Sequence, residues 1–161
     1  MSEETAVQRA VAQIGVRLRV GANRLSASDD PLYLVLAGPL GREFRLALAR
    51  GPFLRRGQED HFRFGSPDDP AVNVAHPELN DPTAPALDAA AITGISVRKG
   101  LDPIPNVRAL GELDDRLEIA EIAVEIGVRG EPRPLRFARS GPFWLGLVCG
   151  LQLGIPRIDA A

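Results

Sequence analysis

The sequence predicts an all-β fold, an antiparallel β-sandwich of seven to eight strands with a short N-terminal helical arm. Three observations predict it. Apolar and polar residues alternate over several short segments, which is the period of a half-buried strand. The 16 glycines and 14 prolines are scattered over the 161 residues, so turns follow one another at short intervals. A hydrophobic content of 45% is enough for one domain with a core of its own.

The N-terminal residues 2–13 have the local features of a helix. Ser2 can cap the first turn, the acids that follow complement the positive end of the helix dipole, and Val7 and Val11 recur at helical spacing. We therefore expect an arm over residues 1–13. It either docks one apolar face on a partner or on its own domain, or it frays.

From residue 14 onward the apolar period changes to two, which predicts strands. Residues 117–128 (LEIAEIAVEIGV) could also be helical, but the alternation of Ile122, Val124 and Ile126 and their β-branched side chains favour a strand. The Pro-rich stretch 66–88 is expected to be a surface connection with a short edge strand at its Val72–Val74 segment. The other expected strands are 14–20, 32–38, 43–49, 61–65, 90–100 and one or two short strands within 133–147.

Composition and charge exclude several functions. A net charge of −2 gives no general attraction to nucleic acid or to an anionic membrane. Cys149 is the only cysteine and lies in the apolar run GLVCGLQL, so we expect a buried, inert thiol. The acidic N-terminus lacks an apolar signal region, and no apolar run approaches the ~20 residues of a membrane span. We expect a soluble, cytoplasmic protein.

Catalytic patterns are missing from the sequence. His61 and His76 are the only histidines, and they are too far apart for a metal-binding H-x-x-x-H motif. Ser140 lies in RSGPF, which does not match the G-x-S-x-G nucleophile motif. We therefore expect a protein that binds and does not catalyse.

Six segments, in their order along the chain, resemble the PLAT/LH2 (lipoxygenase homology) family: VRLRVG, SDDPLYLVLAG, FLRRGQEDHF, ITGISVRKG, RLEIAEIAVEI and RFARSGPFWL. This β-sandwich domain is found attached to lipoxygenases, some lipases and polycystins. The resemblance covers roughly residues 14–146 and leaves an apolar tail, 147–161, outside it. It implies a sandwich with calcium or lipid binding. The chain departs from the family pattern at Leu117, where the family has tryptophan, and at the shortened turn Asp29-Asp30.

Acidic residues suggest a calcium site at one end of the sandwich. In a succession of antiparallel strands, the loops after the first, third and fifth strands share an end, and the first two of these loops carry Asp29, Asp30, Glu59 and Asp60. Calcium takes about six to eight oxygen ligands, often carboxylates from several loops. Further acids follow in the third loop at positions 102, 114 and 115. Alternatively, these acids are ordinary turn formers without a metal.

The same end offers two further hypotheses for its basic loop. Phe53 and Leu54 could form an apolar tip that contacts a membrane or a partner, with Arg55 and Arg56 touching headgroups. In the alternative, Phe53 folds back over the core and leaves the arginines in solvent.

The two termini suggest assembly. The arm presents Val7 and Val11, and the tail presents Leu147, Leu151 and Ile155, all of which need a partner surface. The tail either packs into its own sandwich or is exchanged within an oligomer. The sequence therefore predicts a non-catalytic interaction module with a protein partner or a homo-oligomer. Calcium-assisted binding of a lipid or membrane surface is the alternative.

Overall fold

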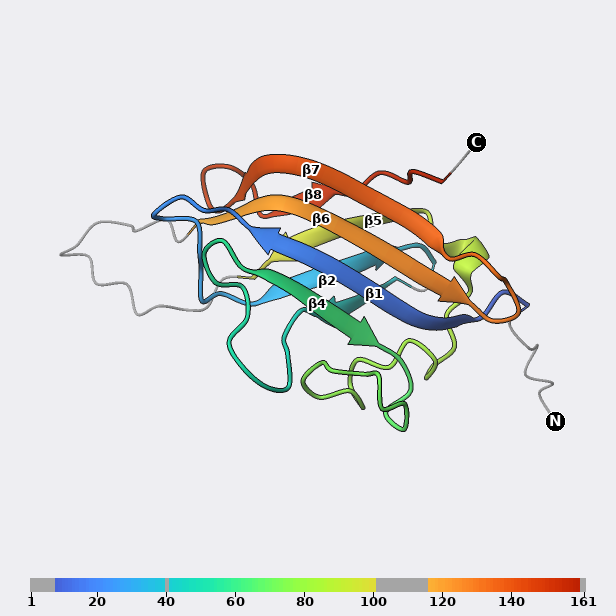
Figure 1. Ribbon diagram of the computed structural model, residues 1–161. Helices are drawn as coiled ribbons and strands as arrows, with labels where there is room; N and C mark the ends of the chain where they lie inside the picture. The colour runs from blue at the N-terminus through green and yellow to red at the C-terminus, as the bar shows by residue number, and fades with distance from the viewer. Residues whose placement is uncertain (1–7, 40, 101–115, 160–161) are drawn as a thin grey trace.

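The computed structural model describes residues 8–39, 41–100 and 116–159, which form two antiparallel β-sheets stacked face to face (Figure 1). The all-β sandwich predicted from the sequence is thus confirmed. In the described residues the elements are β1 (Val11–Val20), β2 (Leu32–Ala37), β3 (Arg42–Arg45), β4 (Glu59–Phe64), the 3-10 helix η1 (Ala89–Ala91), β5 (Gly94–Lys99), β6 (Leu117–Val128), β7 (Leu135–Leu145) and β8 (Gln152–Gly154).

The chain builds the two sheets from strands that are not all neighbours in sequence. The first sheet has the order β4-β1-β6-β7 and the second has the order β3-β2-β5-β8, with antiparallel pairing throughout. The inward residues of both sheets form one apolar core. The rings of Phe44 and Phe64 meet edge to face across this core, with centroids 5.5 Å apart. Such a contact adds to the burial of apolar area that holds the sheets together.

Alternation of side chains explains β1 and locates the face that the first sheet turns to solvent. Ile14, Val16 and Leu18 are buried, whereas Arg17 and Arg19 between them are exposed. Successive side chains of a strand point to opposite faces, so the period of two in the sequence becomes one apolar and one charged face. The strand predicted for 117–128 is likewise confirmed as β6.

The helical arm predicted for residues 2–13 is wrong over its described part, because residues 8 and 9 form a turn and β1 already begins at Val11. The backbone N–H of Val11 donates to the carbonyl of Leu87, and its side chain is buried in the core. Val11 is therefore part of the sandwich and not of an assembly surface. Val7 lies outside the described residues.

An asparagine closes the outer edge of β4 within the long connection between β4 and β5. Asn73 Oδ1 accepts the N–H of Arg63 at 2.8 Å, and Asn73 Nδ2 donates to the carbonyl of His61 at 2.8 Å. The expected edge strand at 72–74 is reduced to one bridge between Val74 and Leu48. The side chain thus protects a strand edge that would otherwise be open for pairing.

The C-terminal tail packs into its own sandwich. Its strand β8 pairs with β5, and Ile155 is buried in the core. The chain then crosses to the first sheet, where Ala138 N–H donates to Pro156 O at 3.1 Å and Ile158 N–H donates to Arg136 O at 2.9 Å. The tail therefore bridges the two sheets along the side formed by β5 and β7.

Candidate functional site

The loops that follow β1, β3 and β7 (residues 21–31, 46–58 and 146–151) lie toward the left of Figure 1, away from both termini. We call this the loop end. The end of β5 and the start of β6 also lie there, and residues 101–115 between them, with the acids predicted at 102, 114 and 115, are outside the described part of the chain.

The first tip of the loop end is Arg24-Leu25, and β6 holds its base. Gly21 N–H donates to the carbonyl of Glu118 at 2.9 Å, and the N–H of Glu118 donates to the carbonyl of Ser26 at 2.9 Å. Because residues 21 and 26 are both fixed to Glu118, the residues between them must project outward. Leu25 is accordingly 71% exposed, a large fraction for a leucine.

The second tip is the turn between β7 and β8. Gly146 N–H donates to the carbonyl of Gly150 at 2.9 Å, which closes the turn and presents Leu147 and Val148, 55% and 85% exposed. Cys149, which we expected to be buried, is also exposed here because the turn extends beyond the sheets.

The two tips lie on the two sides of the start of β6. In the register of β6 and β7, Glu118 is opposite Trp144, two residues before the second turn begins at Gly146. Glu118 also holds the base of the first tip from the β1 side, and Asn23 Nδ2 donates to its side-chain Oε2 at 2.5 Å. One β6 residue therefore positions two exposed apolar tips on its two sides.

Arginines accompany the apolar tips. The guanidinium carbon of Arg116 lies 5.3 Å from the ring centroid of Trp144, within the range of a cation–π contact. Arg24, Arg55 and Arg56 are exposed. The loop end thus combines apolar side chains, the single tryptophan of the chain and positive charge.

Two of the acids predicted to bind calcium are buried and already bonded to protein groups. Asp30 forms an ion pair with Lys99. Asp60 accepts the N–H of Leu54 at 2.7 Å and the side-chain amide of Gln58 at 2.6 Å.

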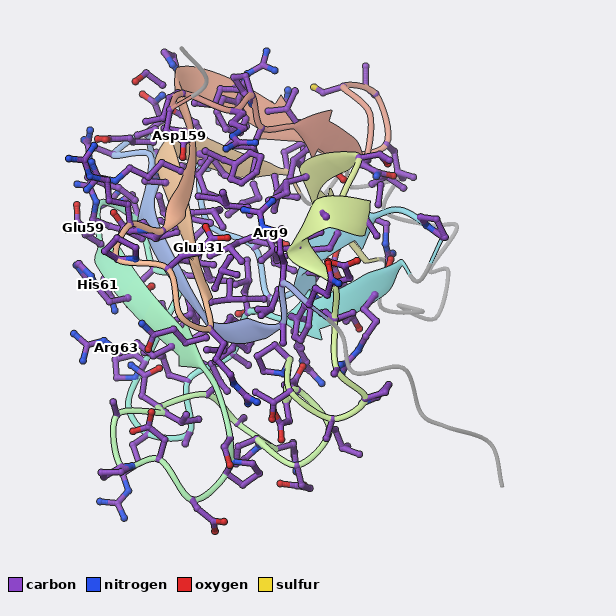
Figure 2. All side chains as sticks on the ribbon, turned by 90° about the vertical axis from the view of Figure 1, so that its right-hand side faces the viewer. Arg9, Glu59, His61, Arg63, Glu131 and Asp159 are labelled. Atoms are coloured by element: carbon purple, nitrogen blue, oxygen red, sulfur yellow. The ribbon has the colours of Figure 1, made fainter. Side chains whose placement is uncertain are left out.

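The other two predicted acids face elsewhere. Glu59 is on the outer face of β4 with His61, whose Nε2 lies 3.0 Å from Glu59 Oε1, and with Arg17 at 3.5 Å (Figure 2). Asp29 is almost fully exposed, 3.7 Å from Arg55. Within the described ranges, no three or more acidic, histidine or cysteine side chains are grouped as a metal site. The four predicted residues therefore do not fit a shared calcium ion.

The four residues of the predicted tip at 53–56 do not all lie on the surface. Phe53 packs edge to face on Phe62, with ring centroids 6.5 Å apart, and Leu54 is only 5% exposed. Leu54 has a left-handed backbone (φ 53°) that lets its N–H reach Asp60 while its side chain enters the core. Phe53 and Leu54 therefore fold back toward the core, as the alternative hypothesis for this loop predicted. Of the four residues, only Arg55 and Arg56 remain on the surface.

Sequence reasoning missed Leu25, because one leucine in a polar turn has no periodicity. Leu147 and Val148 belong to the apolar tail that the sequence indicated, but not as an exposed tip. The signal that could have found Leu25 is its place in ANRLSAS, a turn-rich polar loop with no strand pattern to bury it.

Among the described residues, the pKa shifts lie outside the loop end, and most belong to ion pairs. A bidentate hydrogen bond from Arg98 lowers the pKa of Glu43 on the outer face of the second sheet. At the opposite end of the sandwich, a hydrogen bond from Arg9 lowers the pKa of Glu131 (Figure 2). Both pairs join distant segments and are structural.

No family model and no curated protein matches the chain. Among solved structures it is similar to the alpha toxin from Clostridium absonum (TM-score 0.57, 14% identity, 95% of this chain and 34% of the toxin chain). It is also similar to the Clostridium perfringens alpha-toxin from an avian strain (TM-score 0.58, 15% identity, 96% and 34%). A third structure is coral 8R-lipoxygenase, described with calcium activation via a C2-like domain (TM-score 0.56, 9% identity, 91% and 17%).

These similarities establish the fold alone, because all the identities are low. The β-sandwich implied by the resemblance to the lipoxygenase homology family is thereby supported by a lipoxygenase among the neighbours. The chain spans about a third of the toxins and about a sixth of the lipoxygenase. In the described residues, no helix has the length and apolar character needed to cross a membrane.

Proposed function

We propose that the chain is a non-catalytic β-sandwich module that binds lipid surfaces through its loop end. The observation that carries the proposal is the placement of Leu25 on one loop and of Leu147 and Val148 on another, on the two sides of the same β6 residue. Two neighbouring apolar tips can enter the same layer of a bilayer together. Isolated exposed leucines would carry no such meaning.

The energy of this contact comes from apolar burial and from charge. Full burial of a leucine or valine side chain contributes about 1.5–3 kcal/mol, so three partly inserted side chains give a moderate and reversible affinity. Trp144 suits the interface between headgroups and acyl chains, since its ring is apolar and its N–H is polar. Arginine guanidinium groups pair with phosphate oxygens, which favours anionic lipids.

The similarity in fold adds support of a weaker kind. The coral 8R-lipoxygenase is described with activation via a C2-like domain, so a sandwich of this fold can serve an accessory function in a larger protein. We propose the same accessory class for this chain. Its partner would be a lipid surface.

The termini expose fewer apolar side chains for assembly than we expected. Ile155 is buried in its own core, Leu151 is half-buried, and Val11 belongs to β1. Leu147 is exposed, but it lies at the tip next to Val148. These placements favour lipid contact over protein assembly for the exposed part of the tail.

Co-sedimentation with phospholipid vesicles tests the proposed function. We expect the protein to sediment with vesicles that contain phosphatidylserine, and a Leu25→Ser/Val148→Ser variant to remain in solution. Leu79→Ser is a matched control, because Leu79 is 72% exposed but lies on the connection between β4 and β5. Equal loss of binding in both variants would contradict a role for the loop end.

A further inference from the structure

Lys99 is the only lysine of the chain, and its ammonium group is inside the protein. It is the last residue of β5 and follows Ile95 and Val97 on the core-facing side of that strand. Its side chain is 1% exposed and that of its partner Asp30 is 7% exposed. A buried charge is costly unless it is paired, so each of these two groups stabilises the other.

The position of Lys99 links the two apolar tips. Its Nζ donates to Asp30, at the end of the loop that carries Leu25. Its backbone N–H donates to the carbonyl of Leu151 at 2.8 Å, at the end of the turn that carries Val148. The next residue, Gly100, donates to the carbonyl of Pro31 at 2.7 Å. The end of β5 therefore connects the end of the loop that carries Leu25 with the end of the turn that carries Val148.

In proteins, a calcium ion can bridge several loops by binding carboxylates from each of them. Here the carboxylate best placed for it, Asp30, already has an ammonium group as its counter-ion. A divalent ion approaching Asp30 would meet the positive charge of Lys99 at close range, in an interior where repulsion is strong. Asp60, the other buried acid among the four predicted calcium ligands, is held by Leu54 and Gln58.

We propose that Lys99 is a built-in cation of the loop end, which takes the place of a metal ion at Asp30, and that the described loops work without calcium. The part of this proposal that concerns lipid binding rests on the proposed function. The part that concerns the loops does not, because it follows from the Lys99–Asp30 pair alone.

Thermal unfolding of the full chain tests the loop part, in millimolar calcium chloride and in chelator. The melting temperature of the unmodified protein should be the same in both. Lys99→Met removes the ammonium partner of the buried Asp30 carboxylate, which should lower the melting temperature by roughly 6–20 °C. Calcium should then raise it again, because Asp30 lines, together with Asp29, Arg45 and Arg55 among others, a cavity of about 200 Å³ that can admit the ion.

A charge-neutral double variant is the control. Asp30→Asn/Lys99→Met removes both charges and should recover much of the stability without any response to calcium. The melting temperature of Lys99→Arg, which keeps the charge, should also not change with calcium. Calcium stabilisation of the unmodified protein would overturn the proposal, and this result does not depend on whether a variant folds. A folded Lys99→Met protein that ignores calcium would overturn it as well.

Vesicle co-sedimentation in calcium and in chelator tests the lipid part. Equal binding in both buffers is expected. Binding that requires calcium would overturn the proposal of a calcium-independent site, but it would still support the proposed lipid binding. An absence of binding in both buffers would overturn the proposed function, while the melting temperatures would still decide whether Lys99 replaces a metal ion.

Discussion

Glu118 and Trp144 lie directly opposite each other in β6 and β7, and the two apolar tips of the loop end lie on the two sides of Glu118. Glu118 also fixes Gly21 and Ser26 at the base of the first tip. The tips are thus held by sheet hydrogen bonds and not by contacts between flexible loops. A rigid base lets Leu25 and Val148 remain exposed without collapsing onto the protein.

Removal of the apolar tips should weaken vesicle binding. We expect Leu25→Ser and Val148→Ser each to reduce the partition coefficient by about tenfold, because each loses on the order of 1.4 kcal/mol of apolar burial. Folding should not change, since both side chains are exposed. Titration with vesicles of increasing lipid concentration measures the effect. Unchanged partition coefficients for both variants would show that the tips do not enter the bilayer.

Removal of the arginines should change lipid selectivity. Arg24→Gln, Arg55→Gln and Arg56→Gln should each lower binding to anionic vesicles by about fivefold, which corresponds to roughly 1 kcal/mol per charge near the membrane. Binding to neutral vesicles should change little, and salt should reduce the difference between the two lipids. Arg129→Gln, an exposed arginine after β6 at the opposite end, is the control. A loss of the same size for Arg129→Gln would indicate non-specific attraction.

The buried acceptor at position 60 should matter for stability. Asp60→Ala removes the acceptor for the N–H of Leu54 and for Gln58. We expect a loss of about 1–3 kcal/mol in the free energy of unfolding, because a buried N–H is left without a partner. Urea denaturation followed by circular dichroism measures it. Arg56→Ala, on the same loop but exposed, should change stability by less than about 0.5 kcal/mol.

The pair of Glu43 and Arg98 should give a stabilisation that depends on pH. Arg98 reaches from β5 across Tyr33 of β2 to Glu43 of β3, with hydrogen bonds of 2.8 and 2.7 Å, and its hydrogen bond lowers the pKa of Glu43. A carboxylate with a lowered pKa in the folded state stabilises the protein above its unfolded pKa, and this contribution is lost as pH falls through the folded pKa.

Arg98→Gln should therefore destabilise the protein at pH 7 by at most about 1 kcal/mol, since the pair is largely exposed. The difference from the unmodified protein should shrink as pH falls below the ordinary carboxyl pKa of 4.5. Melting temperatures between neutral and acidic pH measure it. A difference that stays constant over this range would mean that Arg98 acts only through its stacking on Tyr33.

The strands were predictable because burial of one sheet face imposes a period of two on each of them. Ile14, Val16 and Leu18 show this period, and the structure buries all three. The predicted N-terminal helix was wrong over residues 8–13, because local spacing also fits Val11, whose burial depends on a strand more than a hundred residues away. Helix propensity cannot detect that pairing.

The site was only partly predictable, for a related reason. The sequence indicated an end of the sandwich with acids and arginines, but not which acids would already be neutralised. Lys99 and Asp30 are 69 positions apart, so their ion pair has no local signal. Likewise, Phe53 and Leu25 are both apolar residues in loops, and only the surrounding structure buries one and exposes the other.

The fluorescence of Trp144 is the most direct test of lipid binding through the loop end. Trp144 is the only tryptophan of the chain, and it lies at the base of the second tip. On titration with phosphatidylserine-containing vesicles, its emission should shift to shorter wavelength, and lipids brominated near the headgroup should quench it. If the protein sediments with these vesicles while the spectrum and the quenching of Trp144 stay unchanged, another surface makes the contact and the loop end is not the lipid-binding site.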